Sequence, residues 1–228
     1  INADGSKMYF TSRRPVTEKE KKKGKPATEN IYYSDFDTKN KKWSEAKLLT
    51  SVINQPKRFN SIIAISNDAQ RMLIYRDDKY GNGDIYESVL NGSVWSEPEK
   101  LPEPINSKDM ESSASISPDG HTIYFVSNRP GGSGGLDIWY CTKNQQGIWS
   151  EAKNIGTTIN SSSSEEGVFI HPDGKTLYFS SRGHKGFGGY DIFCSRMVNN
   201  KWTTPKNLGA EINSPDDDVY FVMKANGE

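Results

Sequence analysis

The stretch SPDGHTIYFVSNRPGGSGGLDIWY, Ser117 to Tyr140, decides the fold, because it returns almost unchanged as HPDGKTLYFSSRGHKGFGGYDIFC from His171 to Cys194. Both copies contain a Pro-Asp-Gly turn, an apolar strand, a glycine-rich loop and a second apolar strand that opens with Asp. Such duplication indicates either an architecture built from repeats or a duplicated site. The spacing of other markers decides between these two interpretations.

Three independent markers divide the whole chain into four similar units. A tryptophan followed by Ser or Thr recurs at intervals of 52, 54 and 53 residues, as Trp43, Trp95, Trp149 and Trp202. An asparagine after Ile repeats the same intervals, as Asn54, Asn106, Asn160 and Asn213. The triplets NIY, DIY, DIW and DIF are centred on Ile31, Ile85, Ile138 and Ile192. A fixed period of this length is typical of repeat architectures.

Within each unit the pattern predicts four antiparallel strands in a meander. The strand that contains MYF, IYF or LYF is apolar on both faces, as expected of a sheet packed between neighbouring sheets. Four-stranded units of this length, stacked face to face around an axis, form a β-propeller. We therefore expect an all-β propeller with repeats at about 1–60, 61–111, 112–164 and 165–217, followed by one further strand in 218–228.

The number of blades in the ring stays open at this point. The segment Asp218–Lys224 could pair with Met8–Ser12 and close a four-bladed ring. Alternatively, the chain is a window cut from a ring of five or more blades. An unpaired edge at either end would then favour association.

Composition excludes several classes of partner. The 29 basic residues balance the 29 acidic residues, so no overall field attracts nucleic acid or an anionic membrane. No apolar run approaches the roughly 18 residues of a membrane span, and no export signal is visible in the sequence as given. Cys141 and Cys194 occur at nearly matching places in their repeats, one residue out of step, and a pair of buried free thiols is favoured over a disulfide.

The pattern SPDG…IYF.S.R…GG.DI resembles the WD-like propeller repeat of the TolB type. With the WSEAKNIG..IN tail, it is most similar to the propellers of Bacteroidetes OmpA-family cell-envelope proteins. This resemblance covers essentially the whole chain and implies a periplasmic, outer-membrane-associated protein with protein partners in the envelope. It also implies that peptidoglycan is bound only by a separate domain, and it is compatible with a role in anchoring secretion machinery.

Two repeats depart from the pattern. The first carries the insertion VTEKEKKKGKPAT, residues 16–28, where the others have glycine-rich segments, and its composition favours a solvated loop over a docking patch. The lysines of that alternative patch are Lys19, Lys21, Lys22, Lys23 and Lys25. The second repeat has NDAQ where the turn glycine is expected.

Charged residues recur at corresponding places and should gather on one rim of the propeller. These candidate blade-locking or binding residues comprise three sets: Arg13, Arg76, Arg129 and Arg182 after the second strand; Asp84, Asp137 and Asp191 at the start of the third; and Glu111, Glu166 and Asp217 before the first. An arginine can donate paired hydrogen bonds to a carboxylate. Because these residues repeat, architecture explains them better than catalysis, which requires unlike groups at one place.

No motif supports a cofactor or a metal. The glycine-rich loops lead into strands rather than helices, so they do not form phosphate cradles. His121, His171 and His184 share no zinc-ligand spacing, and no G-x-S-x-G nucleophile turn is present.

Two functions therefore remain. The first is a non-catalytic module that presents a rim and a central funnel to a protein or cell-wall partner. The second is a glycoside hydrolase with two carboxyl groups in the central channel, drawn from Glu111, Glu166 and Asp217. Two channel carboxylates with unlike surroundings would favour the enzyme, whereas a channel lined by Ser and apolar side chains would favour the binding module.

Overall fold

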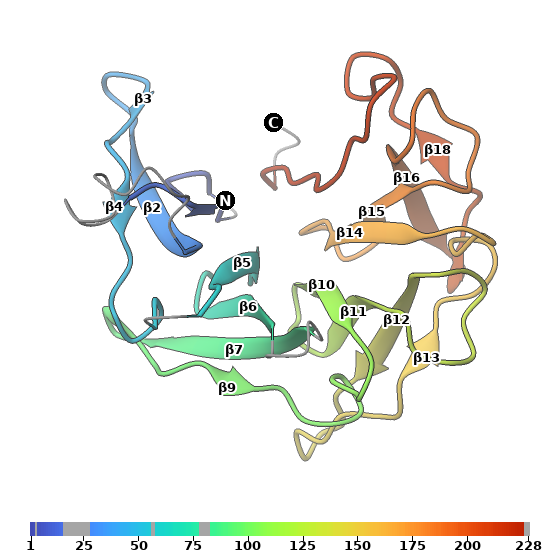
Figure 1. The fold of residues 1–228 in the computed structure, drawn as a ribbon, viewed down its shortest axis with the longest axis horizontal. Coiled ribbons are helices and arrows are strands. Elements are labelled where there is room, and N and C mark those ends of the chain that lie inside the picture. Colours follow the sequence, from blue (N-terminus) through green and yellow to red (C-terminus); the bar gives the residue numbers. More distant parts are fainter. Residues whose placement is uncertain (3, 16–27, 56–57, 78–82, 226–228) are drawn as a thin grey trace.

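The computed structural model describes residues 1–228 except 3, 16–27, 56–57, 78–82 and 226–228. The described strands form four antiparallel sheets that stand around a common axis (Figure 1). The predicted all-β propeller is therefore confirmed. The lysine-rich insertion of the first repeat falls almost entirely outside the described residues.

Each sheet is a meander that forms one blade. Blade 1 contains β1 (Lys7–Ser12), β2 (Asn30–Asp37), β3 (Lys42–Trp43) and β4 (Lys47–Leu48). Blade 2 contains β5 (Ser61–Ile65), β6 (Arg71–Asp77), β7 (Gly83–Asn91), β8 (Val94–Trp95) and β9 (Glu99–Lys100). Blade 3 contains β10 (Glu111–Ile116), β11 (Thr122–Ser127), β12 (Asp137–Thr142) and β13 (Lys153–Asn154). Blade 4 contains β14 (Glu165–Ile170), β15 (Thr176–Ser181), β16 (Asp191–Val198), β17 (Lys201–Trp202) and β18 (Lys206–Asn207).

The predicted single fourth strand is in fact two short pieces on either side of a break after the tryptophan, and in blade 3 the first piece is reduced to a single bridge between Lys143 and Trp149. At the break, a hydroxyl accepts a hydrogen bond from a backbone N–H of the third strand. Ser96 Oγ accepts from Val89 N at 3.0 Å, and Thr203 Oγ1 accepts from Arg196 N at 3.0 Å. Ser44 and Ser150 do the same in the other two blades. This bond explains why Ser or Thr follows every repeated tryptophan.

The turn between the first two strands keeps its shape where the glycine is missing. Gly120 and Gly174 adopt φ values of 71° and 67°, in the left-handed region. Ala69, in the NDAQ turn, adopts φ of 57° in the same place. An L-residue with a side chain is strained there, so the turn is maintained by its surroundings at a local cost.

The repeated asparagines and the repeated isoleucines bind each other in every blade. Asn106 Oδ1 accepts from Ile85 N at 2.8 Å, and its Nδ2 donates to Ile85 O at 2.8 Å. The same two bonds join Asn54 to Ile31, Asn160 to Ile138 and Asn213 to Ile192. Each asparagine is at most 8% exposed. The two sequence markers therefore share one period because they are two halves of one clamp.

Apolar cores fill the three seams between consecutive blades, and the tryptophans close them. Trp95 of blade 2 packs edge-on against Tyr9 of blade 1, with ring centroids 6.0 Å apart, and Trp202 of blade 4 packs similarly on Tyr124 of blade 3. Trp95 is only 5% exposed, whereas Trp43 of blade 1, which has no preceding blade, is 36% exposed. Burial of each tryptophan thus depends on the neighbouring blade.

Within the described residues, blade 1 contains no inner strand equivalent to β5, β10 and β14. The predicted pairing of Asp218–Lys224 with β1 is not formed in the described residues, where β1 pairs only with β2. Instead, Asp218 N donates to Tyr190 O, and Phe221 packs on Tyr178 with ring centroids 5.0 Å apart. The segment after β18 therefore lies on blade 4 and runs into the opening of the ring (Figure 1).

Candidate binding site in the central channel

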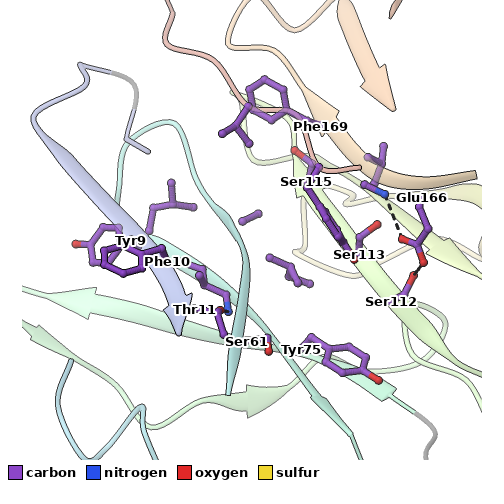
Figure 2. A pocket seen from close by; sticks show the side chains of 18 of the residues that line it. Tyr9, Phe10, Thr11, Ser61, Tyr75, Ser112, Ser113, Ser115, Glu166 and Phe169 are labelled. Atoms are coloured by element: carbon purple, nitrogen blue, oxygen red, sulfur yellow. Dashed lines mark hydrogen bonds between the residues drawn. The ribbon is translucent and has the colours of Figure 1, made fainter. Parts of the chain in front are cut away.

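A cavity of about 640 Å³ lies at the axis of the propeller, between the inner strands. Its polar lining comprises Thr11, Glu29, Ser61, Ser112, Ser113, Ser115 and Glu166. Its apolar lining includes Phe10, Ile62, Ile63, Val168, Phe169 and Phe221. Figure 2 shows that β1, β5, β10 and β14 all contribute side chains, so that every blade takes part.

Bulges in the inner strands determine which side chains reach the cavity. The register of β10 against β11 shifts between Glu111 and Ala114, and β5 and β14 shift at corresponding places. A bulge breaks the alternation of faces and redirects neighbouring side chains. As a result, Ser112 and Ser113 both line the cavity although they are adjacent in sequence.

Glu166 is the acidic side chain of β14 that lines the cavity. Its carboxylate accepts hydrogen bonds from Ser112 Oγ at 2.7 Å and from Gly167 N at 3.1 Å. Burial raises the pKa of this carboxyl group, and the hydrogen bonds from Ser112 and Gly167, together with the nearby Ser113 hydroxyl, offset the shift only in part. Within the described residues, no Lys, Arg or His lies within ion-pair distance of it.

Glu29 is the second carboxylate of the cavity, and its surroundings differ. Arg13 donates to it through Nε at 2.9 Å and Nη2 at 2.6 Å, and the Ser61 hydroxyl donates to its other oxygen. Glu29 is thus paired with a cation, whereas Glu166 is not. The predicted Arg13 does find a carboxylate, but that carboxylate was not among the predicted ones.

Glu111 does not face the cavity but locks the corner of blade 3. Its carboxylate is 0% exposed and accepts from Ser107 N at 2.9 Å, Ser107 Oγ at 2.8 Å and Ser127 Oγ at 2.8 Å. In blade 4 the same bonds, from Ser161 and Ser181, are made to Glu165.

The expected equivalence of Glu111, Glu166 and Asp217 is therefore wrong by one residue. The equivalent residues are Glu111, Glu165 and Asp218, the last of which accepts hydrogen bonds from Ser214 N and Oγ. Glu166 instead corresponds to Ser112 and Ser61 in the pairing registers of β14, β10 and β5. Glu166 is thus a departure from the repeat.

The four predicted arginines occupy three kinds of place. Arg129 is enclosed in the blade 3 corner, where it donates to Glu111 at 2.9 Å and to the carbonyls of Pro104 and Ile105. Arg76, 3% exposed, donates to Ile53 O at 2.9 Å and has no carboxylate partner among the described residues. Arg13 and Arg182 lie at the surface and pair with Glu29 and Asp217, respectively.

In blade 4, a histidine takes the place that Arg76 and Arg129 hold in blades 2 and 3. His184 Nε2 contacts Ile159 O at 2.7 Å.

The three predicted aspartates open the third strands, but only two hold a glycine-rich loop in the described structure. Asp137 accepts from Ser133 N and Gly134 N at 3.0 and 3.1 Å, and Asp191 accepts from Phe187 N and Gly188 N at similar distances. Both are 1% exposed. Asp84 pairs with Lys100 at 2.7 Å instead.

The other reactive groups of the described residues form no second site. Cys141 and Cys194 are free thiols, as favoured from the sequence, but only Cys141 is fully buried, whereas Cys194 is half-buried. Burial raises the pKa of Cys141 to about 12. The described residues contain no group of three or more His, Cys, Asp or Glu side chains that could hold a metal ion. They also contain no helix with the length and apolar character of a membrane span.

No family model matches the sequence, and no curated protein matches it either. The structure is similar to TolB from Acinetobacter baumannii, with a TM-score of 0.54 and 17% identity over 90% of this chain and 42% of that one. It is also similar to a protein described as TolB from Agrobacterium tumefaciens, with a TM-score of 0.57 and 18% identity over 92% and 63% of the two chains. The fold is a TolB-like β-propeller. A chain in a nidogen/laminin complex is similar as well, with a TM-score of 0.53 and 12% identity over 89% and 61%.

At these identities the likeness concerns the fold alone, and the chain spans less than two thirds of each of these proteins. Two acidic residues of this TolB-like propeller, Glu165 and Glu29, were not predicted from the sequence. Glu165 could have been found by counting back from the Pro-Asp-Gly turns, since Glu111 and Glu165 both stand seven residues before the proline. Nothing in the repeat pattern points to Glu29.

Proposed function

We propose that this TolB-like propeller is a non-catalytic binding module whose central channel receives a segment of a protein partner. The single observation that supports this function most is the cavity of about 640 Å³ lined by hydroxyl and apolar groups. A mixed lining of this kind suits a peptide, because hydroxyls pair with its backbone and apolar walls accept its side chains. A similar propeller occurs in a nidogen/laminin complex, which is compatible with a role in protein binding.

We further propose that the module works in the periplasm in association with the outer membrane, where it helps to assemble or anchor envelope machinery. This context rests on the resemblance of the repeat to Bacteroidetes OmpA-family propellers, in which peptidoglycan is bound by a separate domain.

We assign blade locking to Glu111, Arg129, Asp137 and Asp191, which are buried or nearly so. Arg13, Arg182 and Asp217 are more exposed and could contact a partner at the rim.

Photo-crosslinking in cells that express the full protein tests this function. A benzophenone amino acid at Thr11, in the channel lining, should give discrete protein adducts, while the same group at Val94, 60% exposed on the outer edge, should not. Ser113→Trp should fill the channel and remove the Thr11 adducts. Adducts that are equal at Thr11 and Val94, or that survive Ser113→Trp, would contradict a channel site.

A glycoside hydrolase is the second candidate, because Glu29 and Glu166 line one cavity in unlike surroundings. Glu166, with its raised pKa, would be the acid, and Glu29, paired with Arg13, would be the second carboxyl group. Of the three carboxylates first considered, only Glu166 lines this cavity. A panel of glycosides should show no turnover if the binding function is correct. Turnover that is abolished by both Glu166→Gln and Glu29→Gln, with the fold intact, would establish the enzyme instead.

A further inference from the structure

Glu166 differs from its counterparts in the other blades at a position that faces the channel. The registers of β5, β10 and β14 place Ser61, Ser112 and Glu166 at corresponding points. Both serines donate their hydroxyl to a carboxylate, Ser61 to Glu29 and Ser112 to Glu166. The blade architecture is satisfied by a serine at this point, so the carboxylate of Glu166 is not required by the fold.

The charge of Glu166 has no counter-ion within the described part of the chain. Its hydrogen-bond partners are a hydroxyl and a backbone N–H, which stabilise a carboxylate less than a cation does. Glu29, on the same cavity, shows the contrast, because Arg13 donates two hydrogen bonds to it. A half-buried acid without a cation is costly to ionise, and a ligand cation would lower that cost.

A second polar group beside Glu166 also lacks a partner. Ser113, 2% exposed, lines the cavity next to Ser112, and its Oγ makes no hydrogen bond of good geometry to the described residues. It lies close enough to Glu166 to favour the ionised form. A ligand group with several N–H donors could donate one hydrogen bond to the Glu166 carboxylate and another to the Ser113 hydroxyl oxygen.

We infer that Glu166, with Ser112 and Ser113, forms a subsite for an ammonium or guanidinium group in the central channel. This inference rests on the proposed function and specifies the partner: the segment that enters the channel carries a Lys or Arg side chain. The apolar lining from Ile63, Val168 and Phe169 suits the methylene stem of such a side chain, whose charged head then meets the carboxylate.

Carboxyl-carbon NMR of the full chain tests the subsite with defined probes. Titration with n-butylammonium or methylguanidinium should shift the Glu166 signal saturably and bring its pKa down toward the ordinary glutamate value. The neutral probe n-butanol should leave that pKa unchanged. Glu166→Gln should weaken binding of n-butylammonium by at least about tenfold, as expected for loss of a charged hydrogen-bonding partner. The control Glu151→Gln, at an exposed acid outside the cavity, should bind as the wild type does.

Two results would overturn the subsite: a Glu166 pKa that the cations leave unchanged, or one that n-butanol lowers equally. Circular dichroism of both variants checks that the fold is intact. If the cations do not bind at Glu166 while Thr11 still gives adducts that Ser113→Trp removes, the channel binds a partner without a cation subsite. If the cations bind but the Thr11 adducts are absent, the subsite stands and the proposed protein-binding function falls.

Discussion

Blades 3 and 4 contain the most similar segments of the chain, yet their corners are completed differently. In blade 3, Glu111 accepts hydrogen bonds from Ser107, Ser127 and Arg129. In blade 4, Glu165 has the two serines but no arginine, and burial raises its pKa. Arg182, which looks like the counterpart of Arg129, lies one residue earlier relative to the end of its strand and turns to Asp217 at the surface.

This difference separates what the fold requires from what it tolerates. The serine bonds to a buried acid and the asparagine clamp occur in both blades, so they are architectural. The arginine occurs in one corner only, and His184 replaces its contact to a carbonyl in the other. On the inner strand, Ser112 gives way to Glu166, and this substitution changes the channel rather than the blade. Departures between near-identical repeats therefore mark where function is to be sought.

The largest effect expected from this comparison is that of Arg129→Met. The substitution leaves Glu111, which is 0% exposed, without its cation, and breaking a buried pair in this way costs about 3–5 kcal/mol. Chemical denaturation should show a corresponding loss in the free energy of unfolding. If Arg129→Met lowered the free energy of unfolding no more than Arg182→Met does, the arginine in the corner of blade 3 would contribute no more to stability than the surface arginine of blade 4.

The asparagine clamps should have similar effects in the two blades. Asn160→Ala and Asn213→Ala each leave the N–H and C=O of a buried isoleucine, Ile138 or Ile192, without their partner. Unsatisfied buried groups cost roughly 1–3 kcal/mol each. Because the two groups belong to one residue, their costs do not add in full, and we expect a loss of about 2–4 kcal/mol in both variants. Denaturation of the two proteins side by side is the measurement. Strongly unequal losses would mean that the clamp is not a shared element.

The fold was predictable because the residues that repeat in the sequence are the ones that contact each other in the structure. Asn106 and Ile85 form one clamp, and Trp95 fills one seam, so their period reports the blades directly. The site was less predictable because neighbouring acids such as Glu165 and Glu166 cannot be told apart without the register. The split fourth strands and the position of Phe221 on blade 4 depend on contacts between distant residues, which no local pattern reports.

Glu165→Gln should have an effect that depends on pH. The folded-state pKa of Glu165 is raised, so the folded protein holds this proton more tightly than the unfolded chain does. The stability that Glu165 contributes is therefore present below its ordinary pKa and falls as pH rises through the raised value. Denaturation between about pH 5 and pH 8 should show that the free energy of unfolding of Glu165→Gln, relative to that of the wild type, increases as pH rises. The exposed control Glu151→Gln should show no such gain. A constant difference across this range would mean that the corner of blade 4 stabilises an ionised carboxylate even without an arginine.

The smallest effect expected is that of Arg182→Met, although its sequence context resembles that of Arg129. Arg182 and Asp217 are 48% and 51% exposed in their side chains, and their oxygen–nitrogen distances are 3.0 and 3.3 Å. Water and salt screen a pair of this kind, so the loss should be far smaller than that of Arg129→Met and shrink as salt is added. Asp217 keeps a hydrogen bond from Tyr190 N at 2.8 Å in the variant, so the loop retains one of its attachments. Denaturation at low and high salt is the measurement, with Arg129→Met beside it. If Arg182→Met lost as much stability as Arg129→Met, and lost it equally in high salt, the surface pair would be a structural lock and the contrast between the two corners would fail.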